Sequence, residues 1–190
     1  AQVQAVNEIG ERIQDLRAAW KWAVDQSQFE VIAQSQACLH FFFSLRGWHQ
    51  EGLLAFETAL KKLEEQPDPW PPSHYQLLLH LLANQAHNYI DLGRLDEALT
   101  TAERSLELAR QYGDPGDITL IQLELARVIW LRGDYVETGK LAQECLERAR
   151  QEDDQKSSAD ALSQLGTIHW ASGDYTQAAE LTRQALAIYR

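Results

Sequence analysis

Three side chains between residues 80 and 91 are of the types that a metal site or an acid–base centre uses. His80 and His87 are seven residues apart, and Asp91 follows four residues later, so one face of a helix would hold all three. Imidazole and carboxylate groups bind transition metals, but the His-x-x-x-His pair of helical zinc sites is missing. We therefore favour histidines that line a groove or stabilise the fold, and we predict neither a metal nor a cofactor.

The segment GDYVETGK (133–140) is close to a phosphate-binding loop, which would bind a nucleotide. That motif needs four residues between its glycines and a hydroxyl residue after its lysine, because the hydroxyl binds Mg²⁺ while backbone amides surround the phosphates. Here five residues separate Gly133 from Gly139, and Leu141 replaces the hydroxyl residue. The segment also follows a helical pattern and not a strand. We therefore reject a nucleotide site at this segment.

Catalytic constellations are missing elsewhere in the sequence. No nucleophile lies in a recognisable elbow, and no pair of carboxylates stands out among the 28 Asp and Glu residues. The sequence therefore predicts a protein that is not an enzyme. The minor alternative, an enzymatic site around His87, would require clustered titratable groups with strongly perturbed pKa values.

The composition restricts the partners. The chain has 190 residues and a formal net charge of −11. Because phosphate neutralisation dominates nucleic-acid affinity, we expect no direct binding to DNA or RNA, and the same charge argues against anionic membranes. The sequence has neither an apolar stretch of about 20 residues nor a secretory signal. Cys38 and Cys145 are expected as buried, reduced thiols of a cytoplasmic protein.

A forty-residue repeat positions the side chains discussed above. Gly93, Gly133 and Gly173 are spaced by forty, and each lies between two runs with apolar residues at intervals of three and four. Glycine suits a helix C-terminus that needs positive φ, and the aspartate after Gly133 and Gly173 suits a helix N-cap. Each unit is therefore predicted as helix, tight turn, helix. Strand signals are nearly absent, so the predicted fold class is all-α.

Small residues support close helix pairs within each unit. Ala98, Ala126, Gly166 and Ala178 fall where the two helices of a hairpin would cross, and bulky side chains there would push the helices apart.

At these positions the chain resembles the tetratricopeptide repeat (TPR). The resemblance rests on GTIHW (166–170), on the GDY turn and on the small residues Ala178 and Ala185, and it covers 73–190 as three units. Thr138 and Cys145 depart slightly from the small-residue positions. The resemblance implies a right-handed α-solenoid of antiparallel helix hairpins, a TPR superhelix of about nine helices.

A fourth, degenerate unit precedes the three. Gly47 occupies its turn position, forty-six residues before Gly93, and the prolines of 65–72 absorb the extra length. The chain has no methionine and stops inside a helical pattern, so we expect a fragment of a longer polypeptide. We expect one domain over 1–190, made of a leading helix (8–26), a degenerate repeat (28–65) and TPR-like repeats (73–112, 117–151 and 157–190).

The first units carry a second resemblance. LRAA (16–19), WA (22–23), RG (46–47) and WHQEG (48–52) resemble the start of the helical sensor region in STAND-type bacterial regulators. In those proteins this region follows nucleotide-binding and winged-helix domains, which would lie before residue 1. The resemblance implies a sensor or interaction module of a larger signalling ATPase or transcriptional regulator.

The TPR arrangement implies a concave face, lined by the first helix of each hairpin, that binds extended segments or partner helices. Asn84 is suited to a peptide backbone, and Arg127 to a ligand carboxylate or to Glu124. Trp130 and Trp170 are suited equally to groove anchors and to core packing. The expected binding residues are Phe41, Asn84, His87, Asp91, Glu124, Arg127, Trp130, Gln164, Thr167 and Trp170.

The sequence thus predicts a non-enzymatic module that binds a protein, a peptide or an inducer within a larger STAND-like regulator. The alternative is a stand-alone TPR scaffold that holds a peptide in its groove. The expected partner is a protein or peptide, or the upstream domains of the same polypeptide, and a small-molecule inducer is a further alternative. Self-association through the open C-terminal repeat is also expected, since terminal repeats normally need a polar cap.

Overall fold

The computed structural model describes residues 10 and 12–189. Within that part the chain forms nine helices and no strand, which confirms the all-α prediction. Residues 8, 9 and 11 of the predicted leading helix lie outside the described residues, as does residue 190 of the last repeat. The helices are α2 (Ile13–Asp25), α3 (Phe29–Arg46), α4 (His49–Glu64), α5 (Pro72–Asp91), α6 (Leu95–Tyr112), α7 (Pro115–Leu131), α8 (Tyr135–Gln151), α9 (Gln155–Ala171) and α10 (Tyr175–Ile188).

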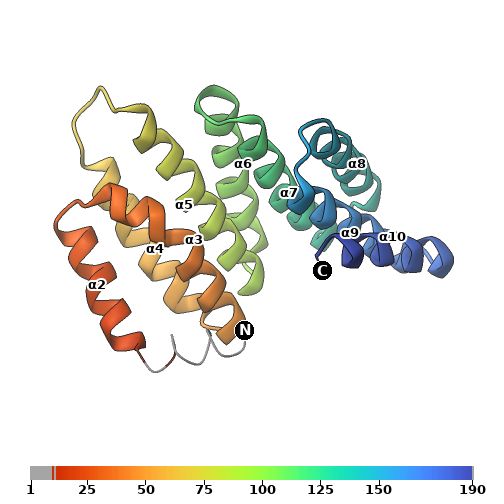
Figure 1. Cartoon of the computed structure of the whole chain (residues 1–190), viewed down its shortest axis with the longest axis horizontal. Coiled ribbons are helices and arrows are strands. Elements are labelled where there is room, and N and C mark those ends of the chain that lie inside the picture. The colour runs from red at the N-terminus through yellow and green to blue at the C-terminus, as the bar shows by residue number, and fades with distance from the viewer. Residues whose placement is uncertain (1–9, 11, 190) are drawn as a thin grey trace.

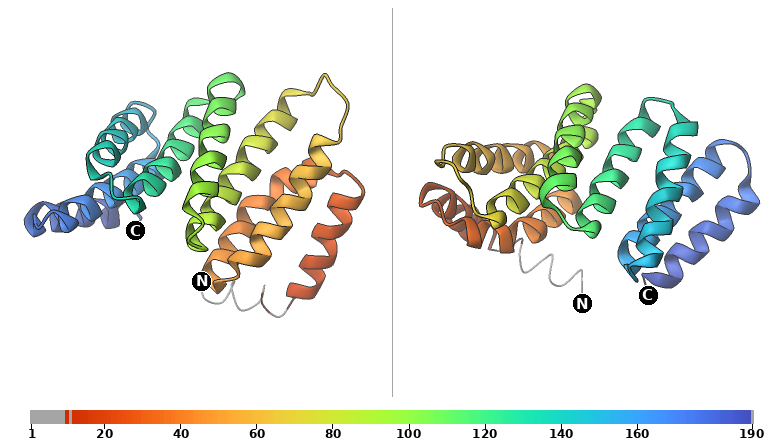
Figure 2. Two further views of the ribbon diagram at one scale, coloured as in Figure 1. Left: turned by 180° about the vertical axis from the view of Figure 1, so that it is seen from behind. Right: turned by 90° about the horizontal axis from the view of Figure 1, so that it is seen from above.

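The helices pair as antiparallel hairpins that stack side by side (Figure 1). The hairpins are α3–α4, α5–α6, α7–α8 and α9–α10, and α2 packs against α3 and α4 at one end of the stack. Two further views show a curved array in which each hairpin follows the previous one (Figure 2). The chain is therefore a helical-repeat solenoid.

The first helices of successive hairpins lie on the inner side of the curve. Helix α3 packs against α5, α5 against α7, and α7 against α9. Within the described residues, the second helices α6, α8 and α10 make no comparable contact with one another. Helices on the inside of a curve come closer together than those on the outside. This pattern therefore places α3, α5, α7 and α9 around a concave groove.

Glycines close the hairpins in the left-handed backbone region. Gly47, Gly93, Gly133 and Gly173 have φ values between +68° and +91°, which confirms the predicted positive φ. At the end of α5 the Gly93 N–H donates to the Ile90 carbonyl at 2.9 Å. Other L-residues would be strained in this conformation, so the forty-residue spacing of glycine follows from the turn itself.

Aspartates cap several helix N-termini, as predicted for the residue after Gly133 and Gly173. The side-chain oxygen of each accepts the N–H three residues ahead at 2.8–3.1 Å, in Asp114, Asp134, Asp154 and Asp174. Because Asp114 and Asp154 are the N-caps, α7 and α9 begin at residues 115 and 155. Each helix thus starts two residues before the repeat starts expected at 117 and 157.

Small residues stand where the helices of a hairpin cross, as predicted. Ala98 and Ala126 are fully buried, and Ala178 is nearly so. A Cβ atom on Gly166 would lie 3.0 Å from Thr182 Oγ1 and 3.4 Å from the Ala178 carbonyl oxygen. Glycine at 166 therefore allows α9 and α10 to approach closely.

Apolar side chains fill the space within and between hairpins. Leu79, Leu81 and Ile121 are fully buried, so each hairpin is stabilised by its neighbours. Cys145 is buried as predicted, and burial raises the pKa of its thiol to about 11. The burial predicted for Cys38 is wrong, because this residue is exposed on α3. Over residues 10 and 12–189, no helix combines the length and the hydropathy of a membrane span.

Candidate functional site

Helices α3, α5, α7 and α9 position all ten predicted groove residues. The repeat places Asn84, Glu124 and Gln164 at equivalent positions on three successive inner helices, since they are forty residues apart. The set comprises Phe41 on α3; Asn84, His87 and Asp91 on α5; Glu124, Arg127 and Trp130 on α7; and Gln164, Thr167 and Trp170 on α9.

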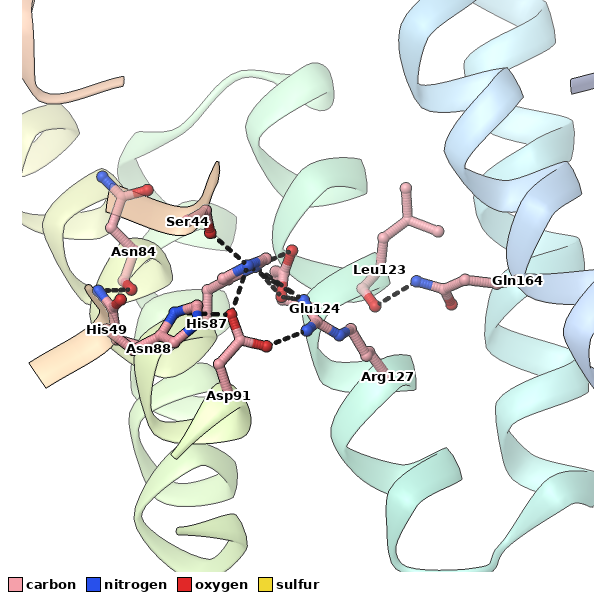
Figure 3. A network of polar contacts seen from close by, with 10 residues as sticks. All are labelled: Ser44, His49, Asn84, His87, Asn88, Asp91, Leu123, Glu124, Arg127 and Gln164. Carbon is pink, nitrogen blue, oxygen red and sulfur yellow. Dashed lines mark hydrogen bonds and ion pairs between the residues drawn. The ribbon is translucent and has the colours of Figure 1, made fainter. Parts of the chain in front are cut away.

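His87 is the centre of a polar network between α5 and α7 (Figure 3). Its Nδ1 lies 3.2 Å from the nearer carboxylate oxygen of Glu124, and its Nε2 lies 3.3 Å from Asp91 Oδ2. Ser44 Oγ, on α3, lies 3.3 Å from the same Nε2. The network therefore joins three of the four inner helices.

Arg127 completes the network from α7. Its Nη2 donates to Asp91 Oδ1 at 2.6 Å, while its Nη1 lies 2.9 Å from His87 Nδ1 and 3.7 Å from a Glu124 oxygen. His49, the first residue of α4, lies 3.1 Å from the other Asp91 oxygen through its Nδ1. Of the two alternatives for Arg127, the structure has the intramolecular one, with Asp91 as the closer carboxylate and Glu124 as the farther.

The charges of this network compensate one another. Burial lowers the pKa of His87, but hydrogen bonds to Asp91 and Glu124 outweigh it and raise that pKa to about 9. Burial raises the pKa of Asp91, but the hydrogen bond and charge of His87, with the charge of Arg127, lower it to about 2. The same two cations keep the pKa of Glu124 below its usual range against the effect of burial. At neutral pH two carboxylates thus face two cations.

His40 is the neutral neighbour of the network. Its ring meets the ring of His87 edge-on, with 4.6 Å between the centroids. Burial lowers the pKa of His40 to about 4, and the positive charge of His87 acts in the same direction. Two histidines in contact therefore differ in protonation at neutral pH.

Sequence reasoning missed Ser44, His40 and His49. The first unit is forty-six residues from the second, so its residues fall out of the forty-residue register. The available signal was the i, i+4 spacing of His40 and Ser44, which puts both on one face of α3. The predicted residue of that helix, Phe41, is instead 54% exposed.

Asn84 is engaged within the chain as well. Its Nδ2 hydrogen-bonds to Gln36 Oε1 on α3, and its backbone carbonyl accepts from Asn88 Nδ2 at 2.9 Å. A ligand that uses the Asn84 amide would therefore have to compete with Gln36.

A second part of the groove, between α7 and α9, has unsatisfied polar groups. Trp130 Nε1 and Gln164 Oε1 are buried, and neither has a hydrogen-bond partner among residues 10 and 12–189. Leaving a buried donor or acceptor unpaired costs about 1–3 kcal/mol. Gln164 is held in place by its Nε2, which donates to the Leu123 carbonyl at 2.8 Å. Both residues line a hollow of about 180 Å³, together with Arg127, Thr138, Ser163 and Thr167.

The two tryptophans differ in environment. Trp130 is half-buried at this hollow, whereas Trp170 is 64% exposed at the outer face of the last hairpin. Thr167, between them along the groove, is exposed and donates its hydroxyl hydrogen to the Ser163 carbonyl at 3.0 Å. Neither tryptophan is thus a fully buried core residue.

In the described part of the chain, no group of three His, Cys, Asp or Glu side chains is arranged to hold a metal ion. His80, the first of the three residues considered for a metal, lies 2.6 Å from Asp117 at the start of α7. His87 has carboxylate partners of its own. The histidines therefore join neighbouring hairpins.

Ser44, His87 and Glu124 have the order of a serine–histidine–carboxylate triad, but not its protonation state. The base of a triad must be a neutral imidazole that accepts the serine proton. With a pKa of about 9, His87 carries a proton on both ring nitrogens at neutral pH. It therefore cannot act as the base for Ser44.

The comparisons with known proteins agree with this architecture. Residues 79–112 and residues 117–190 each match a family model described as the tetratricopeptide repeat, and together the matches cover more than half of the chain. The chain is a tetratricopeptide-repeat domain. No curated protein matches its sequence.

Solved structures share the fold of this tetratricopeptide-repeat domain at low sequence identity. The apo form of RapI has a TM-score of 0.70 and 14% identity, over 97% of this chain and 67% of that chain. A STAND protein with a tetratricopeptide repeat sensor from Pyrococcus horikoshii has a TM-score of 0.60 and 19% identity, over 96% of this chain and 27% of that chain.

A third structure with this fold contains a peptide. It is PlcR of Bacillus thuringiensis in complex with the peptide PapR7 and DNA, with a TM-score of 0.60 and 14% identity over 94% of this chain and 70% of that chain. At such identities the likeness concerns the fold alone. The tetratricopeptide-repeat domain is thus similar in architecture to these three proteins, one of which is a STAND protein with a tetratricopeptide repeat sensor.

Proposed function

We propose that this tetratricopeptide-repeat domain is a non-enzymatic binding module whose concave groove holds a protein or peptide segment. One observation carries the proposal: on the successive inner helices α7 and α9, Arg127, Trp130, Gln164 and Thr167 line an open hollow of about 180 Å³. Tryptophan and arginine are among the residue types that are enriched where protein interfaces bind most strongly.

The network around His87 supports the proposal as a rigid wall of the groove. Its members are fixed by contacts between helices, such as Arg127 with Asp91 at 2.6 Å and His87 with Glu124 at 3.2 Å. A preorganised surface loses less conformational entropy on binding than a flexible one. The exposed Thr167 then offers contact area beside that wall.

We further propose that the domain is the sensor region of a larger, cytoplasmic STAND-like regulator. The fold likeness to the sensor-bearing STAND protein and the peptide-bound PlcR structure support this context. The alternative remains a stand-alone scaffold that holds a peptide in the same groove. The gene separates them: a nucleotide-binding domain encoded upstream favours the sensor, and a start codon just before residue 1 favours the scaffold.

The sensor hypothesis requires two states with different affinities for the ligand. The polar network offers a place for such a difference, because it joins α3, α4, α5 and α7 through Ser44, His49, Asp91 and Arg127. A ligand that competes for Arg127 would loosen the contact between two hairpins. The curvature of the array would then change with occupancy.

The second candidate is an acid–base site around His87. The perturbed pKa values that this alternative requires are present in His87, His40 and Asp91. Paired charges produce such shifts in structural networks as well. Because His87 is protonated and already paired with two carboxylates, we favour the structural interpretation.

A photo-crosslinking experiment tests the groove. Benzoylphenylalanine is placed at Thr167, which is exposed in the groove, and at Gln143, which is exposed on α8, as the control. The captured protein is then purified and titrated against Thr167→Arg and Gln143→Arg by calorimetry. We expect Thr167→Arg to weaken binding at least tenfold and Gln143→Arg to leave it unchanged. Equal affinities for the two variants would refute groove binding.

A further inference from the structure

An apolar trough lies between α2 and α3, at the end of the stack where α2 packs (Figure 1). Side chains of both helices line it: Leu16, Ala19, Trp20 and Ala23 on α2, and Val31, Ser35, Cys38, Leu39 and Phe42 on α3. The lining residues of α3 follow one another at intervals of three and four from residue 31 to residue 42. The trough therefore follows one face of α3 for about three turns.

The floor of the trough is buried, and its rim is open to solvent. Ala23 and Phe42 are 1% and 2% exposed, whereas Leu16 and Val31 are 38% and 46% exposed. The enclosed volume is about 210 Å³. A molecule can therefore enter from solvent and reach side chains that are otherwise buried.

The polar groups of the trough are satisfied within the chain. Trp20 Nε1 donates to the Ala55 carbonyl at 3.2 Å, and Ser35 Oγ donates to the Val31 carbonyl at 2.6 Å. The exposed thiol of Cys38 is only a weak donor, and no charged residue lines the trough. A charged or strongly polar ligand would lose hydration without gaining a partner. The lining therefore selects an uncharged, apolar ligand.

The size of the trough favours a small molecule over a protein. Nine residues line it, whereas a stable protein interface uses roughly 20–30 residues on each side. Its volume is also below the roughly 300–1,000 Å³ of pockets that enclose drug-sized ligands. An apolar cavity of about 150 Å³ binds benzene, a ring of six carbons. By the same measure, the trough has room for roughly six to eight carbons.

We propose that this trough is a binding site for a small, uncharged apolar molecule, either a single ring or a short alkyl chain. The site is separate from the peptide groove, because α3 contacts α5 through other residues, His40 and Ser44. A molecule in the trough contacts α2 and α3 together. It therefore strengthens the packing of the leading helix on the first hairpin by burying apolar surface of both.

Nuclear magnetic resonance with alcohols of increasing chain length tests the site. The ¹⁵N-labelled domain is titrated with 1-butanol, 1-hexanol and 1-octanol, and the indole cross-peak of Trp20, one of six tryptophans, is assigned by its loss in Trp20→Phe. Complete burial of one methylene group raises affinity about fourfold. We expect the half-saturating concentration to fall about two- to fourfold per methylene from butanol to hexanol. The gain from hexanol to octanol should be smaller, because the trough is then full.

Two adjacent alanines of α2 provide the variant and its control. Ala19 lines the trough, so Ala19→Phe should fill it and abolish the shift of the Trp20 cross-peak. Ala18 is exposed and does not line the trough, so Ala18→Phe should leave the titration unchanged. No shift in the wild-type protein would overturn the proposal. The same titration in folded Ala19→Phe would overturn it as well, because the alcohols would then bind elsewhere.

The thiol of Cys38 gives a second measurement that needs no variant, in case Ala19→Phe disturbs the fold. Cys38 is exposed and Cys145 is buried, so a thiol reagent modifies Cys38 in the folded domain. Hexanol at a saturating concentration should slow this reaction at least threefold, because Cys38 lines the trough. An unchanged rate of modification would contradict binding at this site.

Discussion

Leu146 and Leu186 occupy equivalent positions in successive repeats, yet Leu146 is 3% exposed and Leu186 is 52% exposed. Helix α9 packs on α8 and covers Leu146, whereas no hairpin of the described chain covers Leu186. The apolar surface that one repeat buries therefore belongs largely to its contact with the next, as expected for a solenoid.

This pair gives a first prediction for stability. Leu146→Ala should lower the free energy of unfolding by about 2–5 kcal/mol, because it removes buried contacts and leaves a cavity. Leu186→Ala should change it by less than about 0.5 kcal/mol, because the side chain is half in solvent. Urea denaturation followed by circular dichroism measures both. Similar losses in the two variants would show that Leu186 is covered in solution.

The same surface carries the proposed self-association through the last hairpin. Leu186 lines an open hollow with Trp170, Tyr175 and Thr182, and we expect two copies of the chain to meet there. Leu186→Glu should then shift a concentration-dependent dimer toward monomer in sedimentation velocity, whereas Leu54→Glu, at the exposed Leu54 of α4, should not. A wild-type protein that stays monomeric at high concentration would contradict the self-association.

Two glycines of one hairpin should respond to alanine with opposite signs. Gly133 has φ +91°, and an L-residue in the left-handed region costs about 1–2 kcal/mol, so Gly133→Ala should destabilise the domain. Gly139 lies inside α8, and a Cβ atom added there would meet open space, so Gly139→Ala should stabilise the domain by about 0.5–1 kcal/mol. Thermal unfolding of the two variants decides this. A loss of stability in both variants would mean that α8 tolerates no added methyl group.

The pKa values of His40 and His87 shift in opposite directions. We therefore predict that the free energy of unfolding is greatest near pH 6.5, between these two pKa values. The pKa of His87 is raised to about 9, so its contribution is complete below about pH 6.5 and is lost as pH rises through 9. The pKa of His40 is lowered to about 4, so stability is lost as pH falls from about 6.5 toward 4. At about 1.4 kcal/mol per pKa unit, each arm is at most about 3.5 kcal/mol.

Single variants assign the two arms of this profile. His87→Gln should flatten the alkaline arm, and it should also weaken the acid arm, because the charge of His87 contributes to the low pKa of His40. His40→Gln should remove only the acid arm. Urea denaturation at pH 5, 6.5 and 9 measures these effects. An alkaline arm that persists in His87→Gln would assign it to another group.

The architecture was predictable because its causes are local. A glycine at positive φ, an aspartate cap and apolar residues at intervals of three and four each act within a few residues, and the forty-residue period repeats them. Gly93, Gly133 and Gly173 therefore indicated hairpins without any knowledge of tertiary contacts. The order of the inner helices followed from the same period.

The internal pairing of the groove was only partly predictable. Asn84 was expected to contact a ligand, and Arg127 to contact either a ligand or Glu124, but their partners Gln36 and Asp91 lie 48 and 36 residues away along the chain. The degenerate first unit lies outside the forty-residue register, so Gln36, His40, Ser44 and His49 could not be aligned with their neighbours. The unpaired Trp130 and Gln164 were named as groove residues, although their lack of partners depends on side-chain packing that a sequence does not state.

Two arginines with the same separation from their partners test whether the groove network is structural. Arg127 pairs with Asp91 at 2.6 Å and Arg132 pairs with Asp96 at 3.0 Å, each across thirty-six residues. The Asp91 side chain is 19% exposed and the Asp96 side chain 89%, so solvent screens only the second pair strongly.

A double-mutant cycle of Arg127→Ala with Asp91→Asn should give a coupling energy of about 1–2 kcal/mol, whereas Arg132→Ala with Asp96→Asn should give a value near zero. Urea denaturation provides the free energies of unfolding for both cycles. High salt should weaken the first coupling only in part, because the Arg127 and Asp91 side chains are 31% and 19% exposed. A coupling near zero for Arg127 and Asp91 would mean that the arginine is held loosely enough to serve a ligand directly, and the rigid-wall interpretation of the groove would then fail.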